Sequence, residues 1–156
     1  MEKIIKELKL ARGLLFRNNQ ILLVKDIRPN QGHYFLPGGS VELGEAVRIS
    51  LVREWKEELG WVVVVGSFFG CLEHSWNFNR KSDNALVDVV EVNYLFNISV
   101  ENKYLEIEPQ SKEDHLSFSW VNLSDLPSLN LLPAPLKSII PKIKENSLRA
   151  IWESTL

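Results

Sequence analysis

The sequence contains a single cysteine and a single methionine in 156 residues. One cysteine cannot form an internal disulfide, which excludes a disulfide-stabilised scaffold and suits a reducing compartment such as the cytoplasm. Cys71 stands in the apolar run 68–72, where a buried structural thiol is more typical than a reactive nucleophile.

Long hydrophobic runs and a strong net charge are also absent. No stretch approaches the length needed to span a bilayer, and residues 1–7 lack the continuous apolar core of a signal peptide. The formal net charge is −2, from 18 basic and 20 acidic residues, so no bulk field attracts a polyanion. We therefore expect a soluble, cytoplasmic protein without a membrane partner, for which nucleic acid is a disfavoured partner.

The composition is that of one folded domain. Hydrophobic residues make up 45% and charged residues 24%, which are ordinary proportions for a globular protein. The length fits one compact domain, residues 1–156, with a substantial core. Because strand-like and helical patterns share the chain without a linker, we expect a mixed α/β fold.

Apolar periodicity predicts the elements of the first part of the chain. Residues 8–16 and 20–26 are apolar and strand-like, and Arg17-Asn18-Asn19 between them favours a hairpin turn. From Glu45 onward the period becomes helical, and Gly60 stands where a helix would end. The predicted apolar stripe of this helix contains Ala46, Ile49, Leu51, Val52, Trp55 and Leu59.

The remainder is expected to be richer in strands. The strand-like stretches are residues 61–69, 85–100 (the longest) and 116–121, with a polar loop over 77–84 and a short helical turn over 122–126. The tail is apolar at helical spacing, which predicts a C-terminal helix over about 134–153. Pro141 predicts a break or a late start in that helix.

Three carboxylates on the first predicted helix carry the strongest chemical signal. Glu54 and Glu58 would lie about 40° apart around the helix, and Glu54 and Glu57 about 60° apart. Like charges at these spacings destabilise a helix by roughly 0.2–0.5 kcal/mol per pair, so the cluster needs compensation. Mg²⁺ or Mn²⁺ would supply it, because hard divalent cations favour carboxylate oxygens. The alternative is a solvated helix face paired with lysine and arginine.

A longer pattern favours the metal site. From Gly39 to Trp61 the sequence reads Gly, five residues, Glu, seven residues, Arg-Glu-Trp, one residue, Glu-Glu, one residue, Gly-Trp. This spacing resembles the Nudix box, in which two bulky apolar positions, here both Trp, accompany the fixed Gly, Glu and Arg. The lead-in Tyr34-Phe35-Leu36-Pro37-Gly38-Gly39 is also similar to that family, and weaker likeness extends over roughly residues 8–140.

The resemblance implies an α/β/α sandwich with a mixed β-sheet, in which the box forms a loop, a helix and a second loop. Glu57 and Glu58 would be the principal ligands of Mg²⁺ or Mn²⁺. Glu54 would be a further ligand or the group that deprotonates the attacking water. The backbone carbonyl of Gly38 would complete the metal shell.

Three further positions of the box have supporting roles under this resemblance. Arg53 and Glu45 would pair and so fix the helix and its loop, which places Arg53 in the catalytic group chiefly as a support. Gly39 would be structural, because glycine permits a tight loop that approaches a metal or phosphate closely.

Residues outside the box are less constrained by the pattern. Glu113 is the first candidate for an additional catalytic carboxylate, with a plain surface loop as the alternative. Glu73 and Glu91 are weaker candidates. An acidic residue in an apolar strand, such as Glu91, needs a partner or a solvated face, and we expect the solvated face. The candidate substrate contacts are Tyr34, Glu73 and Trp76, with Phe78 beside Trp76 in the predicted polar loop.

The resemblance implies metal-dependent hydrolysis of a phosphoanhydride bond in a nucleoside-diphosphate-linked small molecule, such as a nucleoside triphosphate or a nucleotide sugar. Residues 75–79 lack the proline or tyrosine associated with ADP-ribose and dinucleoside polyphosphates in some subfamilies, which counts modestly against both. Two alternatives are a non-catalytic nucleotide-binding sensor or scaffold and a hydrolase directed at RNA. A homodimer is common among similar proteins.

Overall fold

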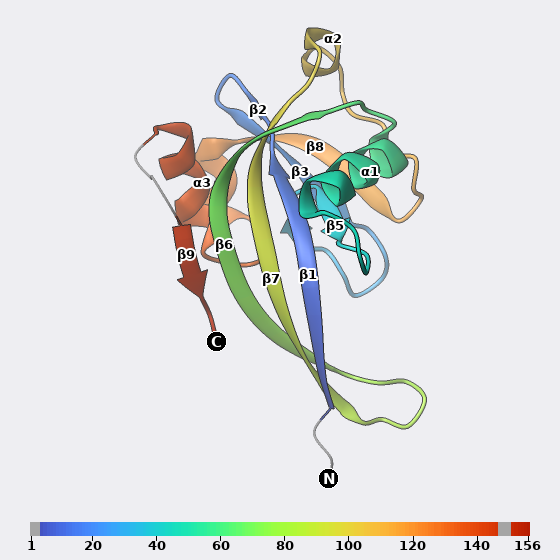
Figure 1. Cartoon of the computed structure of the whole chain (residues 1–156). Helices are drawn as coiled ribbons and strands as arrows, with labels where there is room; N and C mark the ends of the chain where they lie inside the picture. Colours follow the sequence, from blue (N-terminus) through green and yellow to red (C-terminus); the bar gives the residue numbers. More distant parts are fainter. Residues whose placement is uncertain (1–3, 147–150) are drawn as a thin grey trace.

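Two β-sheets form the centre of the computed structural model, which describes residues 4–146 and 151–156 (Figure 1). In chain order the elements are β1 (Ile4–Leu14), β2 (Phe16–Arg17), β3 (Gln20–Asp26), β4 (Tyr34–Phe35), β5 (Gly38–Ser40), α1 (Val47–Leu59), β6 (Val64–Asn79), β7 (Leu86–Ser99), α2 (Asn102–Leu105), β8 (Leu116–Asn122), the 3₁₀ helix η1 (Leu123–Ser128), α3 (Leu136–Lys144) and β9 (Ile151–Ser154).

The larger sheet combines both strand directions. Its order is β5-β1-β7-β6-β9, with β7 parallel to β1 and antiparallel to β6, and β9 parallel to β6. In the smaller sheet β3 pairs with β2, β4 and β8, each in antiparallel orientation. The predicted hairpin turn lies between β2 and β3, where Asn18 has a left-handed φ of 51°. The predicted mixed α/β fold with a mixed sheet is confirmed.

Both faces of the smaller sheet are covered, which explains why β3 is a continuous apolar run. Leu22 and Val24 belong to a core cluster with residues of α1, whereas Ile21 and Leu23 belong to a second cluster with residues of α3. Successive side chains of a strand point to opposite faces, so each helix covers one face. Within the described residues, no helix is both long and apolar enough to cross a lipid bilayer.

Helix α1 ends as its sequence predicts, and it buries Leu51, Trp55 and Leu59 of the predicted apolar stripe but not Ile49. Gly60 has φ 72° and donates its N–H to the Lys56 carbonyl at 3.0 Å, an arrangement that ends many helices. Trp55 is fully buried, but Ile49 is 61% exposed, so its place in the predicted apolar stripe is wrong. The reason is that Ile49 lies about 200° around the helix from Leu51, which is buried.

The C-terminal part differs from the predicted helix over about 134–153. Helix α3 covers only Leu136–Lys144 and continues on both sides of Pro141 without a break. Residues 151–154 form β9, which adds a strand to the edge of β6. Gly70 makes room for it, because a Cβ atom there would lie 2.0 Å from the Ile151 carbonyl oxygen. The predicted helical position Leu148 lies outside the described residues.

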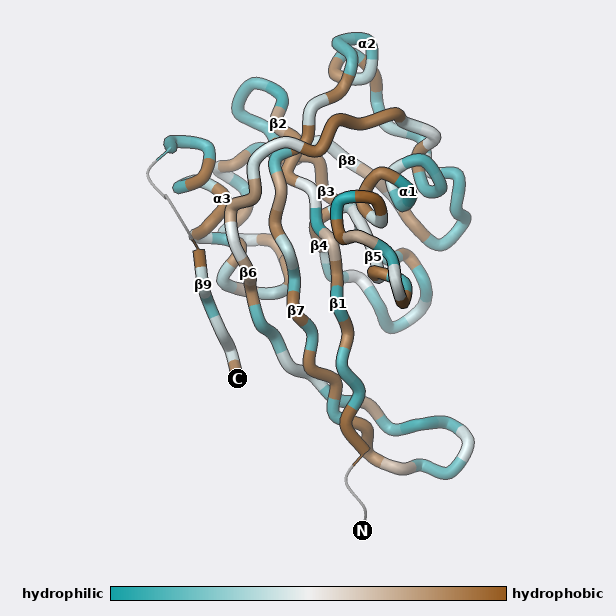
Figure 2. Tube along the Cα trace, viewed as in Figure 1, coloured by the Kyte–Doolittle hydropathy of each residue, from teal (hydrophilic) through white to brown (hydrophobic). Residues whose placement is uncertain are grey.

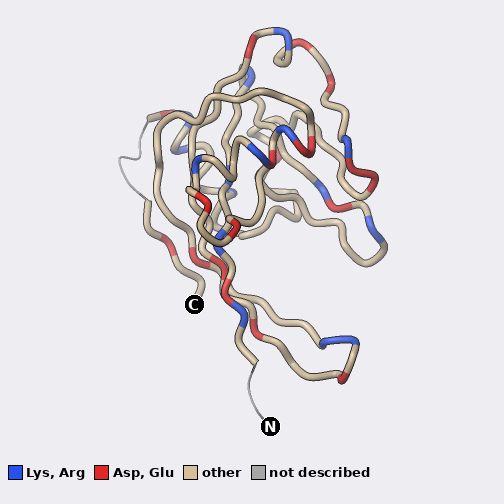
Figure 3. Tube along the Cα trace, turned by 45° about the vertical axis from the view of Figure 1, so that its right-hand side comes forward, with Lys and Arg blue, Asp and Glu red and all other residues tan. Residues whose placement is uncertain are grey.

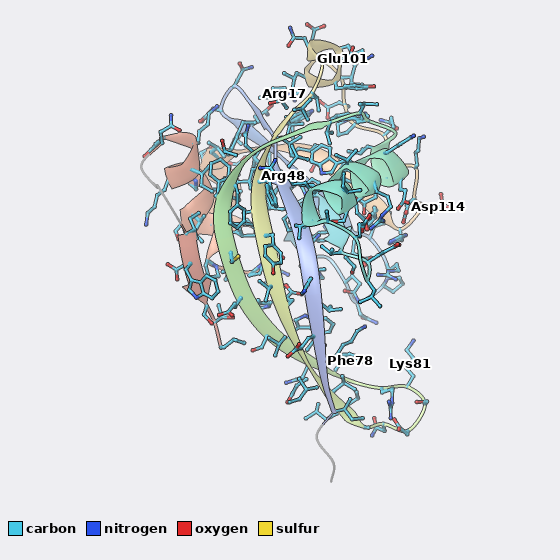
Figure 4. The ribbon with its side chains drawn as sticks, in the orientation of Figure 1. Arg17, Arg48, Phe78, Lys81, Glu101 and Asp114 are labelled. Atoms are coloured by element: carbon cyan, nitrogen blue, oxygen red, sulfur yellow. The ribbon has the colours of Figure 1, made fainter. Side chains whose placement is uncertain are left out.

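Strands β6 and β7 form a long hairpin that extends past the helices toward the start of β1 (Figure 1). Since β6 continues to Asn79, Trp76 and Phe78 are strand residues, and the predicted loop over 77–84 begins three residues too early. The prediction that residues 85–100 form the longest strand is wrong, because β6 has 16 residues and β7 has 14. The turn itself is hydrophilic (Figure 2), with Lys81 at its end and Phe78 on the strand before it (Figure 4).

Candidate active site

Two glycines bring the loop before α1 against the first carboxylate of the helix. Gly38 pairs with Arg12 of β1, and a Cβ atom at Gly38 would lie 2.0 Å from the Ala11 carbonyl oxygen. A Cβ atom at Gly39 would lie 2.5 Å from the carboxyl carbon of Glu54. Any side chain at Gly39 would therefore displace the Glu54 carboxylate.

Arg53 joins the carboxylates of the box. Its Nε and Nη2 donate to the two oxygens of Glu45, both at 2.9 Å, which is the two-pronged geometry in which a guanidinium binds a carboxylate best. Its Nη1 donates to Glu54 Oε1 at 3.0 Å and to Glu57 Oε2 at 3.2 Å. The hydrogen bond with Arg53 lowers the pKa of Glu45. The structure thus brings Glu45, Glu54 and Glu57 together around one guanidinium.

Glu58 lies deepest in the cluster. It is 8% exposed, and its Oε2 has no hydrogen-bond partner among the described residues. Burial, followed by the charge of Glu54, raises the pKa of Glu58 to about 8. Burial also raises the pKa of Glu54. Glu58 is thus a buried carboxylate that disfavours ionisation, and it is not among the carboxylates that accept hydrogen bonds from Arg53.

The loop that carries Glu113 is attached to the end of α1. The Lys112 N–H donates to the Glu58 carbonyl at 2.7 Å, and Asp114 lies near this end of the helix (Figure 4). The Glu113 charge is one of the causes that raise the pKa of Glu58. Its carboxylate lies 3.5 Å from His115 Nδ1 and is 40% exposed. Glu113 therefore adds negative charge at the margin of the site.

The carboxylates fit a divalent cation but are not arranged in advance around one. No group of three or more His, Cys, Asp or Glu side chains within the described ranges forms a ready metal cage. Arg53 holds Glu54 and Glu57, and the Glu57 side chain is 53% exposed. The unpartnered Glu58 oxygen and the raised pKa of Glu58 are what a cation would relieve, and carboxylates are the ligands that Mg²⁺ and Mn²⁺ prefer.

Arg12 is a site residue that the sequence patterns do not reveal. Its Nη1 donates to the carbonyls of Leu36 and Gly38, both at 3.1 Å, and its Nε donates to Asn93 Oδ1 at 3.3 Å. Burial lowers the pKa of Arg12, and the charge of Glu91 opposes this most strongly. The sequence does contain one indication of its role: an arginine within the apolar run Leu10–Leu15 needs buried hydrogen-bond partners.

Arg12 is one of the residues that line a cavity of about 520 Å³. The walls come from β1, β4, β6, β7, the end of β3 with the loop after it, and the segment before α3, and they include Leu8, Phe35, His74, Trp76, Glu91 and Pro133. This volume is in the range of small-molecule sites. Far-apart segments meet there, which is why no local sequence motif predicts it.

Only some of the candidate substrate residues line the cavity. Trp76 and Glu91 line it, whereas Tyr34 and Glu73 do not. Tyr34 packs against the core cluster on the α3 side. Glu73 lies within β6, where its neighbours Leu72 and His74 point to the opposite face of the sheet. The prediction of a solvated face for Glu91 is wrong, because Glu91 is 8% exposed and turned toward the cavity.

Comparisons with known proteins agree on one family. The family model described as NUDIX domain matches residues 7–143. An ADP-ribose pyrophosphatase of Methanocaldococcus jannaschii is 46% identical over 59 residues, which are 37% of this chain and 35% of that protein. A Mycobacterium tuberculosis protein provisionally named 8-oxo-dGTP diphosphatase 2 is 28% identical over 127 residues, 78% of each chain. The chain thus spans about a third of the first of these relatives and most of the second.

Solved structures share the fold at low sequence identity. A NUDIX hydrolase from Nitrosomonas europaea superposes with a TM-score of 0.63 at 14% identity, over 96% of this chain and 78% of that one. The structure of a UDP-X diphosphatase gives a TM-score of 0.61 at 16% identity, over 95% and 67%. At these identities the likeness establishes the arrangement of helices and sheets alone.

Proposed function

Since the chain belongs to the Nudix family, we propose that it is a metal-dependent pyrophosphohydrolase acting on a nucleoside-diphosphate-linked small molecule. One observation supports this most directly: the buried Glu58 carboxylate, beside Glu54, has an oxygen with no hydrogen-bond partner in residues 4–146 and 151–156. A purely structural helix face gains nothing from this arrangement, because an unsatisfied buried carboxylate destabilises the fold.

The residues of the site have different proposed roles. Glu57 and Glu58 would hold Mg²⁺ or Mn²⁺, with Glu54 as a further ligand or as the base and the Gly38 carbonyl as a further oxygen near the site. When bound, the ion neutralises pyrophosphate oxygens and lowers the pKa of a coordinated water. Arg53 fixes the helix carboxylates and the loop relative to one another through Glu45.

Glu54 is the group proposed to take the proton from the attacking water. Its pKa is raised by burial, which makes the carboxylate a stronger base, and Arg53 holds one of its oxygens at 3.0 Å. Glu113 is the alternative base, from the loop attached to the end of α1. The cavity beside Arg12 would receive the part of the substrate that does not react.

The names of the relatives favour a small nucleotide as substrate. They refer to ADP-ribose, 8-oxo-dGTP and UDP-linked compounds, which all contain a phosphoanhydride bond next to a nucleoside. An RNA substrate is disfavoured because charges of both signs are mixed along the described trace, and Lys and Arg form no continuous basic stripe in this view (Figure 3). A sensor is disfavoured because the three helix carboxylates are all present. A homodimer and a cytoplasmic location stay predictions.

The deciding experiment measures nucleotide and phosphate release with Mg²⁺ or Mn²⁺ across nucleoside triphosphates, ADP-ribose and nucleotide sugars. Glu58→Gln keeps the shape of the side chain but removes its charge, and we expect turnover to fall about a hundredfold or more. The matched control is Glu101→Gln, whose carboxylate is 65% exposed at the start of α2 (Figure 4). Equal activity of wild type and Glu58→Gln, or turnover without metal, contradicts the proposal.

A further inference from the structure

We propose that the cavity beside Arg12 selects a guanine base, and that Glu91 is the residue that determines this specificity. The inference rests on the proposed function, because it names the nucleoside of that same substrate. The observations that carry it are the position of the cavity, the hydrogen bonds of Glu91, and the kind of donors that a fixed carboxylate can accept.

The cavity adjoins the carboxylates of α1 through Arg12. This residue lines the cavity, and its Nη1 also donates to the Gly38 carbonyl of the loop beside Glu54. A substrate whose phosphates reach the carboxylates can therefore place its nucleoside in the cavity. The volume of about 520 Å³ is sufficient for one nucleoside.

The carboxylate of Glu91 is fixed in orientation by two neutral donors. Asn93 Nδ2 donates to Glu91 Oε1 at 3.1 Å, and Trp76 Nε1 donates to Glu91 Oε2 at 3.3 Å. Asn93 is itself held, because it donates to the Leu72 carbonyl at 3.3 Å and accepts from Arg12 Nε. Each carboxylate oxygen can accept a second hydrogen bond, so both retain capacity toward the cavity.

The second carboxylate of the cavity is already occupied. Arg28 donates to both oxygens of Asp26, and this pair lowers the pKa of Asp26 to about 2. Glu91 receives neutral N–H groups instead, so its charge is not matched by a direct ion pair of this kind. Of the two, Glu91 is the acceptor that a ligand can use.

Guanine is the common base whose edge matches this acceptor. It presents two adjacent donors, N1–H and the 2-amino group, which can reach the two oxygens of one carboxylate. Adenine and cytosine place an unprotonated ring nitrogen beside their amino group, and that lone pair would face the carboxylate. Uracil and thymine have one N–H between two carbonyl oxygens. A carboxylate that only accepts therefore favours guanine, as an acceptor side chain favours any donor edge.

The walls of the cavity suit a planar ring. Trp76 and Phe35 both line it, and the Trp76 indole holds Glu91 through its own N–H. A base that binds Glu91 would thus lie beside an indole ring, and aromatic side chains stack on nucleobases. Leu8, Leu10 and Pro133 supply apolar contacts for the remaining surface.

The test is equilibrium binding of nucleoside monophosphates to the wild-type protein without metal, measured by calorimetry. We expect GMP to bind on the order of tenfold more tightly than IMP, which lacks only the 2-amino donor, and more tightly still than AMP or UMP. Glu91→Gln should remove most of this preference. Glu7→Gln, an exposed carboxylate on the opposite face of the same sheet, is the matched control and should retain it.

Three outcomes would overturn the inference. Equal affinities for the four nucleotides in the wild type would do so without any variant. An equal loss for all nucleotides in Glu91→Gln would make Glu91 a structural support only. A tenfold weaker affinity for dGMP than for GMP, without discrimination between bases, would show that the carboxylate binds the 2′-hydroxyl of the ribose and not the base. None of these results alters the metal-dependent turnover that tests the proposed function.

Discussion

Two glutamates, Glu58 on α1 and Glu91 on β7, are both only 8% exposed, yet their surroundings differ. Glu58 has an oxygen without a hydrogen bond among the described residues and lies among other carboxylates. Both oxygens of Glu91 accept hydrogen bonds from neutral groups. The difference indicates that the first place suits a cation, which compensates several negative charges at once, and the second suits a neutral ligand with N–H donors.

The pH dependence of stability tests whether Glu58 lies at a place that suits a cation. The pKa of Glu58 is raised from 4.5 to about 8, so its contribution to stability is full below about pH 4.5 and is lost as the pH rises through 8. We expect the free energy of unfolding of the metal-free protein to fall by a few kcal/mol across this range, at roughly 1.4 kcal/mol per pKa unit. Urea unfolding at pH 5 and at pH 8.5 measures the fall.

Glu58→Gln should reduce that fall, whereas the exposed Glu101→Gln should leave it unchanged. Added Mg²⁺ should restore stability at pH 8.5 in the wild type, since a ligand that binds only the folded state stabilises it. If wild type and Glu58→Gln lose stability equally over this range, Glu58 is not the group that lacks a positive partner.

Arg53→Lys tests how the carboxylates of α1 are held in place. Lysine keeps the charge but cannot bind Glu45 through two parallel hydrogen bonds while also reaching Glu54. We expect turnover to fall roughly ten- to hundredfold, as for other residues that orient metal ligands. Affinity for GMP in the absence of metal should stay as in the wild type. A loss of both would mean that Arg53 supports the whole fold and not the carboxylates alone.

Trp76→Phe gives the smallest expected effect and tests the cavity. The phenyl ring retains the stacking surface but lacks the N–H that donates to Glu91 Oε2. We expect the preference for GMP over IMP to decrease by a few-fold, because one neutral hydrogen bond is worth about 1 kcal/mol. Calorimetry with the two nucleotides measures it. An unchanged preference would show that the Trp76 hydrogen bond does not orient the carboxylate.

The parts of the site that follow from local geometry could be predicted from the sequence. Glu54, Glu57 and Glu58 share one side of α1 because their spacing fixes their angles on any helix. Gly60 ends the helix because its φ of 72° suits glycine. The pairing of Arg53 with Glu45 likewise spans about two turns of local structure.

The remainder depends on contacts between distant segments. A polar residue in a strand can face either solvent or a cavity, and Glu91 faces a cavity because β1, β6 and the segment before α3 enclose it. Residues 151–154 have helical spacing in sequence, but the open edge of β6 at Gly70 offers them backbone hydrogen bonds. Both outcomes are decided by neighbours that the local sequence does not contain.

Arg12 connects the proposed nucleotide site with the proposed cation site. Gly38, Arg12, Asn93 and Glu91 form an unbroken series of hydrogen bonds from the loop beside the carboxylates to the floor of the cavity. A nucleotide and a cation bound at its two ends would both act on this one series of hydrogen bonds. Reciprocity follows: whatever factor the cation applies to nucleotide affinity, the nucleotide applies to cation affinity.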